Sequence, residues 1–467
     1  MRRHAGAVTD LLISQRIVGR FGLRLRRTPA GALLAAALAA FVAAPIGVAL
    51  ACSGNVPEPT GTETHFPRMY GDHPTVAELS ALGKRIFSDT GYSASSRQAC
   101  SSCHDPAHAF GPPNALPVQP GGAALDRFGF RNTPSLRYVH SPIPFTQHFM
   151  ESEVTLGADD QGPTGGRTWD GRVNAAHDQA MMPLLDANEM ANPSTDAVFA
   201  HLRASTYADE FRTAVSAPGE NIFDDPASAM IWFTVAVETY EQSSADFHPF
   251  DSKFDAWLAD KVELSPAERR GLALFDDMKK GNCASCHPST RKASTDRAPI
   301  FTDFGFVALA VPRNRTLAAN RDPAFFDLGL CGPVRTDLSD HPGYCGMFRT
   351  PSLRNVALRK SLFHNGAIHS LREAVEFYAT RDTNPAKWYP RDASGHAGYD
   401  DLPARYWPNV SKEVPFAPTP AGKPRLDARE IDDIVAFLKT LTDGYVVPSK
   451  ASTQAAVPAT RVGLAAR

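Results

Sequence analysis

Two five-residue segments carry the most distinctive chemistry of the chain, Cys-Ser-Ser-Cys-His at 100–104 and Cys-Ala-Ser-Cys-His at 283–287. The C-x-x-C-H pattern is typical of covalent c-type haem attachment, in which two thiols form thioethers and the histidine binds iron. A zinc cage of four cysteines is the alternative, but zinc does not require a histidine after both pairs. The predicted attachment residues are Cys100, Cys103, Cys283 and Cys286, and the predicted proximal iron ligands are His104 and His287.

The bulk composition suits a folded protein and argues against some partners. With 467 residues the chain is long enough for roughly two or three domains. The hydrophobic share of 43% and the charged share of 21% are those of a globular protein. The net charge is −2, so no basic field attracts nucleic acid or an anionic membrane surface, and we expect no nucleic-acid partner.

The amino-terminal segment 1–51 has the pattern of an export signal. Arg24, Arg26 and Arg27 precede an Ala/Leu-rich run over 31–51, and small residues precede Cys52. We expect a periplasmic protein, either cleaved or anchored, because the apolar run is also long enough for one membrane helix. Cys52 follows Ala-Leu-Ala as in a bacterial lipoprotein signal, although the leucine departs from the usual pattern, so a lipid anchor is a further alternative.

The two remaining cysteines, Cys331 and Cys345, lie in a loop-rich segment. In an oxidising periplasm they are candidates for a disulfide, and two free buried thiols are the alternative. Neither residue is expected to carry the chemistry.

The chain repeats itself around the two haem motifs. An apolar pattern with helical spacing and a shared glycine precedes each motif, at 82–87 and at 270–275. Thr-Pro-Ser-Leu-Arg at 133–137 recurs at 350–354. We therefore predict a mainly α fold of two tandem cytochrome c-like domains, each with one haem.

The predicted organisation has few strands and many loops. Helical periodicity marks 227–240, 371–378 and 427–441, and strand signals are sparse. The 38 Pro and 33 Gly indicate much irregular structure. The predicted parts are a signal at 1–51, a linker at 52–65, a first haem domain at 66–248, a second haem domain at 249–446 and a disordered tail at 447–467.

Five further motifs occur in a characteristic order along the chain. They are Arg-Asn-Thr-Pro at 131–134, Trp-Asp-Gly-Arg at 169–172, the series Gln179, Pro183 and Glu189-Met190, Phe-His-Asn-Gly at 363–366 and Glu-Ala-Val at 373–375. With the two haem motifs, they resemble the bacterial dihaem cytochrome c peroxidase and MauG family over roughly residues 70–446. The resemblance implies two cytochrome c-like domains with a calcium site at their junction.

The resemblance also implies roles for individual residues. The first haem reacts with hydrogen peroxide in a distal pocket that matches Gln179, Pro183 and Glu189. A carboxylate there can accept the proton of the peroxide and return it to the leaving oxygen, so Glu189 is the expected proton shuttle. A plain surface carboxylate is the alternative. Trp169 matches the tryptophan that relays electrons between the haems, although it can equally serve as a core aromatic.

The implied calcium site departs from the family pattern. Asn132 matches the asparagine that contacts calcium through a hard oxygen donor. At the two other positions this chain has Arg359 and Ser361 where Thr and Pro are usual. Those contacts use backbone carbonyls in the family, so calcium remains an expected cofactor.

Two further departures concern the subgroup. Peroxidases that need reductive activation place a second histidine after the first haem motif, but this chain has none between 109 and 139, so the first iron is expected to be open. His108 is interpreted as a surface or loop side chain. At the second haem Tyr378 stands where electron-transfer peroxidases have methionine, and a phenolate would favour higher iron oxidation states. The alternatives are a core Tyr378 and Met347 as the ligand.

The favoured hypothesis is a MauG-like enzyme. It uses peroxide at the first haem and a high-valent two-haem state to oxidise a Tyr or Trp of a partner protein. Residues 377–382, with Cys-Gly-Pro at 331–333, resemble dihaem enzymes associated with copper-binding partners, including the methanobactin-linked one. The alternatives are a cytochrome c peroxidase that draws electrons from a small cytochrome or cupredoxin, and a plain electron carrier.

Overall fold

The computed structural model describes residues 74–139, 143–149, 160–291, 298–391, 395 and 397–448. All of them belong to one compact unit, His65–Arg467. The predicted signal at 1–51, the linker at 52–65 with Cys52, and the tail from 449 onward lie outside the described residues. Among the described helices, none combines the length and the apolar character needed to cross a membrane.

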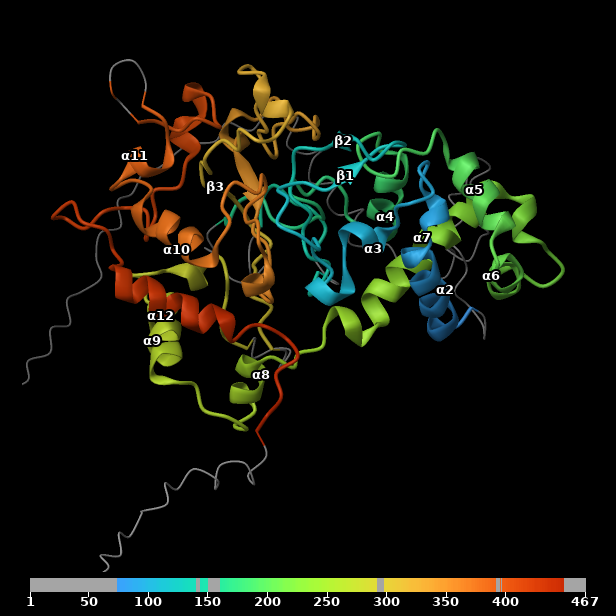
Figure 1. Cartoon of the computed structure of the whole chain (residues 1–467), viewed down its shortest axis with the longest axis horizontal. Coiled ribbons are helices and arrows are strands. Elements are labelled where there is room, and N and C mark those ends of the chain that lie inside the picture. Colours follow the sequence, from blue (N-terminus) through green and yellow to red (C-terminus); the bar gives the residue numbers. More distant parts are fainter. Residues whose placement is uncertain are drawn as a thin grey trace, which may run out of the picture. The chain divides into compact units, whose positions relative to one another are not determined.

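The fold is rich in helix and contains little sheet, as predicted (Figure 1). The α-helices in the described part are α2 (Val76–Ser88), α3 (Cys100–Cys103), α4 (Ala176–Leu185), α5 (Thr195–Ala204), α6 (Ala208–Val215), α7 (Pro226–Ser243), α8 (Lys253–Leu258), α9 (Pro266–Asp276), α10 (Leu371–Thr380), α11 (Pro385–Trp388) and α12 (Ala428–Lys439). The predictions at 227–240, 371–378 and 427–441 are confirmed as α7, α10 and α12.

Short 3-10 helices and two strand pairs connect the α-helices. The 3-10 helices in the described part are η1 (Thr90–Tyr92), η2 (Pro106–His108), η3 (Ile222–Asp224), η4 (Ala245–Phe247), η5 (Cys283–Ser285), η6 (Ala319–Arg321), η7 (Pro342–Tyr344), η8 (Val356–Leu358) and η9 (Ala404–Asn409). The antiparallel pairs are β1 (Pro120–Gly121) with β2 (Arg127–Phe128), and β3 (Phe306–Ala308) with β4 (Met347–Arg349). A disulfide joins Cys331 to Cys345, so of the two alternatives left open by the sequence the structure has the disulfide and not two free thiols.

The helices that precede the two haem motifs begin in the same way. Thr75 and Glu78 form a capping box at the start of α2, and Ser265 and Glu268 form one at the start of α9. In such a box each side chain satisfies a backbone N–H of the other residue, which stabilises the first turn. The two helices thus begin with the same kind of cap, although the caps do not stand at equivalent positions relative to Gly83 and Gly271.

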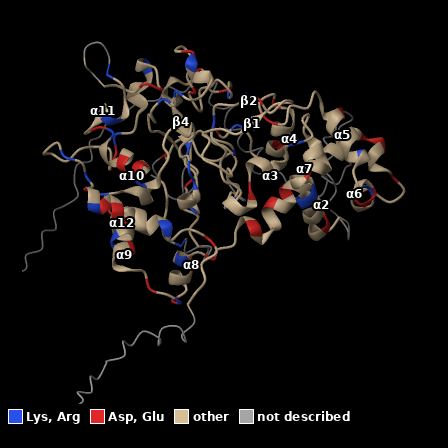
Figure 2. Cartoon of the chain, in the orientation of Figure 1, with Lys and Arg blue, Asp and Glu red and all other residues tan. Residues whose placement is uncertain are grey.

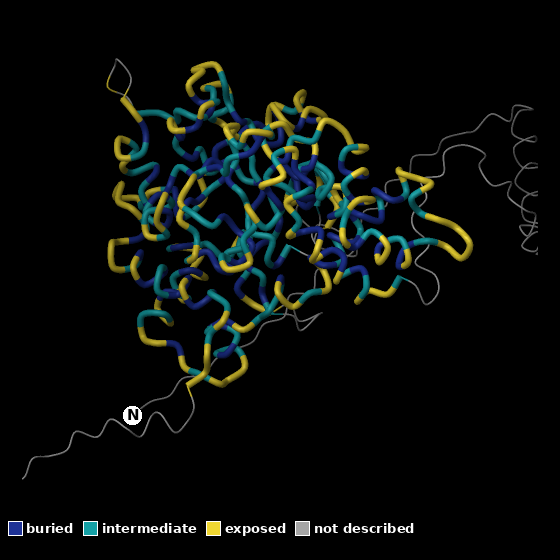
Figure 3. The backbone as a smooth tube through the Cα atoms, turned by 45° about the vertical axis from the view of Figure 1, so that its right-hand side comes forward, coloured by how far each residue is buried: buried dark blue, intermediate teal, exposed yellow. Residues whose placement is uncertain are grey.

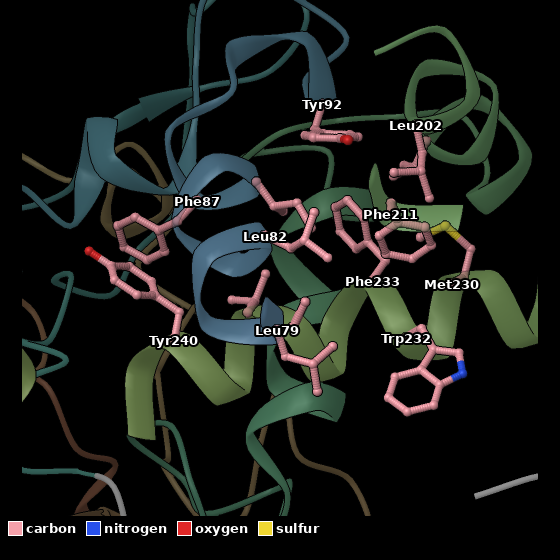
Figure 4. Packing of buried hydrophobic residues seen from close by; sticks show 14 of the residues in the cluster. Leu79, Leu82, Phe87, Tyr92, Leu202, Phe211, Met230, Trp232, Phe233 and Tyr240 are labelled. Atoms are coloured by element: carbon pink, nitrogen blue, oxygen red, sulfur yellow. The ribbon is translucent and has the colours of Figure 1, made fainter. Parts of the chain in front are cut away.

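Each of these helices packs against the last long helix of its half of the chain. α2 lies against α7, and α9 lies against α12. Figure 4 shows Leu79, Leu82 and Phe87 of α2 beside α7. A glycine stands at each crossing, where a Cβ on Gly83 would lie 1.9 Å from the Ala236 carbonyl oxygen and one on Gly271 would lie 1.9 Å from that of Asp433. The glycine shared by the two repeats is therefore required by close helix contact.

The buried residues form two large hydrophobic clusters, one in each half of the chain. The first runs from Leu79 to Phe247 and the second from Phe254 to Leu441. Buried segments alternate with exposed loops throughout the described chain (Figure 3). The predicted domain boundary after residue 248 falls between the two clusters and stays a prediction. Basic and acidic residues are interspersed along the ribbon, in keeping with the small net charge (Figure 2).

One carboxylate after α12 connects the two Thr-Pro-Ser-Leu-Arg segments. Asp443 accepts hydrogen bonds from Arg137 Nη1 at 2.9 Å and from the Tyr138 hydroxyl at 2.7 Å. It also accepts one from Asn355 Nδ2 at 2.6 Å. Tyr138 and Asn355 both have positive φ, 62° in each case, so the two repeats share a backbone turn. Asp443 therefore ties the equivalent turns of both halves together.

The close contact at the helix crossing predicts a large effect of one methyl group. Gly83→Ala should destabilise the protein by about 1–3 kcal/mol, because the added Cβ must push α2 away from α7. Gly129→Ala is the matched control, since a Cβ there meets no atom within 4 Å. Thermal unfolding of the haem-loaded variants measures the difference. Equal melting temperatures for Gly83→Ala and Gly129→Ala would contradict the crossing geometry.

Candidate haem-binding active site

The first haem motif presents two thiols and an imidazole from one short helix and its end. Cys100 and Cys103 begin and end α3 and form no disulfide, and His104 follows as the C-terminal cap. His104 Nδ1 lies 3.1 Å from the carbonyl oxygen of Phe110. Burial lowers the pKa of His104 to about 4, so the ring is neutral at pH 7. With Nδ1–H donated to the carbonyl, Nε2 keeps its lone pair for iron.

The second haem motif has the same arrangement. Cys283 begins η5, Cys286 follows it, and neither forms a disulfide. His287 Nδ1 lies 2.8 Å from the carbonyl oxygen of Phe301. Burial lowers the pKa of His287 to about 4. Both histidines thus meet the usual requirement for a metal ligand, one nitrogen held by an acceptor and the other free to bind.

The two carbonyl groups are held by the Thr-Pro-Ser-Leu-Arg repeat. The backbone N–H of Leu136 donates to the Phe110 carbonyl, and that of Leu353 donates to the Phe301 carbonyl. Both phenylalanines have positive φ, 53° and 55°, which turns their carbonyls toward the histidines. The repeat therefore has a structural role that its sequence did not reveal, because it supports the two histidines that are the predicted proximal ligands.

A serine in each repeat fixes the preceding residue as well. Ser135 Oγ donates to the Ala109 carbonyl and Ser352 Oγ donates to the Ile300 carbonyl, each at 2.6 Å. These serines and the two phenylalanines were missed as site residues, since a backbone acceptor leaves no signal in side-chain chemistry. The recurrence of the pentapeptide is the one sign that could have indicated them.

A large cavity adjoins the second haem motif. Its volume is about 670 Å³, within the range of cofactor sites. The predicted residues that line it are Cys283, Cys286, His287, Tyr378 and Trp169. Paired free thiols, a neutral imidazole and a cavity of this size fit a covalently attached haem.

Tyr378 reaches this cavity from α10. Its hydroxyl makes no hydrogen bond to another described residue, and burial raises the pKa of the phenol. The ring stacks on Phe416 with centroids 5.2 Å apart. Met347 lines the same cavity but packs in a separate cluster around Leu330. The unbonded phenol therefore fits a ligand at the second haem better than the methionine does.

The predicted distal residues of the first haem lie along α4 and the loop after it. Gln179 and Pro183 are one helical turn apart on α4, so they share a face. The Met190 N–H donates to the Pro183 carbonyl at 2.9 Å, and the Gly122 N–H donates to the Glu189 carbonyl at 2.8 Å. The structure thus brings Pro183 close to Glu189 and attaches the Glu189 backbone to the β1 segment.

The environment of Glu189 suits proton transfer. Its side chain is exposed to solvent, yet partial desolvation by the surrounding protein raises the pKa to about 7. Asp186 raises the pKa further and Arg172 opposes the rise. Glu189 also acts electrostatically on Cys100 and Cys103, which places it near the first motif. A carboxyl with this pKa can both accept and donate a proton near pH 7.

Two buried polar atoms associated with the first motif have no partner among the described residues, Gln98 Oε1 and Arg167 Nε. Gln98 Nε2 lies 3.4 Å from Cys103 Sγ. Arg167 is coupled electrostatically to Glu241, which in turn acts on Cys100. Buried polar groups are normally hydrogen-bonded. A haem, whose propionates are acceptors, would supply a partner for the Arg167 guanidinium, so Arg167 also fits the group.

Polar contacts fix both the Trp169 indole and the residue that follows it, Asp170. Its indole Nε1 donates to the Asn132 carbonyl at 2.7 Å. Asp170, the next residue, is fully buried and accepts from Arg131 at 2.6 Å and Arg172 at 2.8 Å. Burial opposes ionisation of Asp170, but the two arginines outweigh it and lower its pKa. The tryptophan at the cavity wall is therefore held rigidly.

The side chain of Asn132, the predicted calcium ligand, is hydrogen-bonded to other side chains of the protein. Asn132 is buried, and its Oδ1 accepts a hydrogen bond from Arg359 Nη2 at 2.6 Å. Its Nδ2 donates to Ser361 Oγ at 2.9 Å. The Asn132 side chain thus has partners from two residues more than 200 positions away in the sequence.

Comparisons with known proteins agree with this arrangement. The profile of a family described as di-haem cytochrome c peroxidase matches residues 77–263. Methylamine utilization protein MauG of Paracoccus denitrificans is 33% identical over 82% of this chain and 93% of its own. Cytochrome c551 peroxidase of Pseudomonas aeruginosa is 27% identical over 65% of this chain and 72% of its own.

A solved structure extends the similarity to the fold. The diheme peroxidase BthA from Burkholderia thailandensis is 39% identical, with a TM-score of 0.68 over 78% of this chain and 86% of that chain. Family members contain haem and act as oxidoreductases on peroxide. The chain therefore belongs to the family of di-haem cytochrome c peroxidases and MauG proteins.

Proposed function

We propose that this chain is a MauG-like peroxidase that oxidises a Tyr or Trp of a partner protein. Two covalent haems, at Cys100, Cys103 and His104 and at Cys283, Cys286 and His287, would serve the reaction. When bound, they supply the iron that reacts with hydrogen peroxide and holds the oxidising equivalents. The partner and a periplasmic location are parts of the same proposal, supported by the sequence patterns.

Glu189 and Gln179 would handle the proton at the first haem. Glu189 accepts the peroxide proton and returns it to the distal oxygen, for which a pKa of about 7 is well matched. Gln179 and Pro183 shape the same side of the pocket from α4. Trp169, held by the Asn132 carbonyl at the cavity wall, provides an aromatic relay toward the second motif.

The observation that carries the proposal is the position of Tyr378. Its phenol faces the cavity of the second motif without a hydrogen-bond partner among the described residues, near Cys283 and Cys286. Oxygen ligation stabilises oxidised iron more than thioether sulfur does. A centre of this kind favours storage of oxidising equivalents over fast electron uptake, as oxidation of a protein substrate requires. A copper-binding protein is the proposed type of partner.

The second candidate is a peroxidase that reduces hydrogen peroxide with electrons from a small cytochrome or cupredoxin. The similarity to cytochrome c551 peroxidase supports it. Met347, which also lines the cavity, would then be the ligand.

Peroxide titration of the purified ferric protein separates the candidates. Without a donor, the oxidised state should persist long enough to be followed by optical and electron paramagnetic resonance spectra. Steady-state oxidation of reduced mitochondrial cytochrome c should be slow. Rapid turnover with that donor would instead establish the second candidate, and no reaction with peroxide would indicate an electron carrier.

Glu189→Gln should slow the reaction with peroxide by about 10²–10⁴-fold, the usual contribution of a general acid–base group. In the unchanged protein the rate should rise as the pH passes through about 7, since only the ionised carboxylate accepts a proton. This rise should vanish in the variant. Stopped-flow kinetics from pH 5 to 9 provide the measurement.

Glu241→Gln is the control for this pH dependence. Burial also raises the pKa of Glu241 to about 7, yet its side chain has no place in the proposed proton transfer. The pH dependence should therefore survive in Glu241→Gln. Loss of the rise in Glu241→Gln and its retention in Glu189→Gln would remove the proton-shuttle role.

Tyr378→Phe should alter the ferric spectrum of the second haem while both haems stay attached, because the ring remains and only the oxygen ligand is lost. Tyr389→Phe is the control, since the hydroxyl of this buried tyrosine donates to the Ala310 carbonyl at 2.6 Å. That variant should lose about 1 kcal/mol of stability and keep its spectrum. An unchanged spectrum in Tyr378→Phe would mean that another side chain binds the second iron.

A further inference from the structure

The side chain of Arg359 enters the region where the two Thr-Pro-Ser-Leu-Arg segments approach the haem sites. Arg359 follows η8, and its Nη2 donates to Asn132 Oδ1 at 2.6 Å and to the Thr133 carbonyl at 2.8 Å. Its Nε makes a longer contact of 3.4 Å with the Ser361 carbonyl. One guanidinium thus contacts three oxygen atoms, two from the segment of Asn132 and Thr133 and one from Ser361.

Two of these oxygen atoms are those that the family resemblance assigns to calcium. It implies contacts from the Asn132 side chain and from the carbonyls of residues 359 and 361. Calcium takes 6–8 oxygen ligands at about 2.3–2.6 Å. Here the guanidinium nitrogen already lies at hydrogen-bond distance from Asn132 Oδ1, and Asn132 Nδ2 is bonded to Ser361 Oγ. The residues present do not fit the ion, because a second cation would meet a positive charge.

The charge of Arg359 has no carboxylate counterpart among the described residues. Its neighbours are the neutral oxygens of Asn132, Thr133 and Ser361. A partly buried cation surrounded by neutral oxygen dipoles resembles the environment of a bound metal ion, supplied here by a side chain. No cluster of three or more His, Cys, Asp or Glu side chains in the described ranges offers an alternative metal site.

We propose that the Arg359 guanidinium takes the place of calcium at this junction, so that the chain needs no metal ion there. This substitution also bears on Trp169, the proposed relay residue. Arg359 donates a hydrogen bond to the Asn132 side chain, and the Asn132 carbonyl accepts one from the Trp169 indole at 2.7 Å. An internal cation positions this tryptophan without depending on calcium concentration. The inference does not depend on which reaction the haems perform.

Metal analysis of the intact haem-loaded protein is the first test. After treatment with EGTA and gel filtration, calcium measured by mass spectrometry should be far below one ion per two haem irons. The melting temperature and the ferric spectrum should be the same in EGTA and in added calcium chloride. A stoichiometric calcium ion, or a spectrum that changes on chelation, would overturn the proposal.

Arg359→Thr is the second test, since it removes the guanidinium and restores the residue usual in the family. This variant should melt lower than the parent in EGTA and recover stability as calcium rises, as expected for a ligand that binds the native state. Arg321→Thr, an exposed arginine on η6, should show neither effect. Loss of stability in Arg359→Thr without any response to calcium would refute the exchange of one cation for the other.

Arg359→Lys keeps the proposal testable if the threonine variant does not fold. Lysine retains the positive charge but offers a single nitrogen, so this variant should fold, melt slightly lower and remain insensitive to calcium. A calcium-dependent melting temperature in Arg359→Lys would show that the side-chain charge does not replace the ion.

Discussion

An imidazole that binds iron needs a fixed acceptor on its other nitrogen, and this requirement organises both halves of the chain. The acceptors are the carbonyls of Phe110 and Phe301, each turned toward its histidine by a positive φ. The phenyl rings of the same residues are almost fully buried in the two hydrophobic clusters. Core packing of the phenyl rings therefore fixes the position of each carbonyl, and each carbonyl fixes the orientation of its histidine ring. Loosening of either cluster would be transmitted to an iron centre.

The two halves share this frame and differ in the side chains that we propose to lie on the distal sides of the haems. In the second half, a tyrosine from α10 points at the cavity beside the haem motif. In the first half, α4 and its following loop contribute a glutamine, a proline and a carboxyl whose pKa is about 7. A duplicated scaffold thus holds two chemically distinct environments. The difference comes from a few side chains, while the proximal geometry stays the same.

The sequence revealed the parts of the fold that depend on side-chain patterns. Helices α7, α10 and α12 were predicted from apolar periodicity, and the cysteine motifs indicated the attachment points, which stay a prediction. The supports of the proximal histidines were missed because a backbone carbonyl is present in every residue. Arg359 was recognised as a departure from the family, but its contact with Asn132 spans 227 positions and follows only from the fold. Long-range polar contacts of this kind leave no periodic trace in a single sequence.

The Asp443 carboxylate has a consequence for the order in which the chain matures. It lies 306 positions after Arg137 and still provides the acceptor for that guanidinium and for the Tyr138 hydroxyl. During synthesis the amino-terminal half is made without this acceptor. The turn that follows the first histidine support therefore gains this anchor only after residue 443 has been synthesised. Folding of the earlier half is in this way coupled to the final helix of the later one.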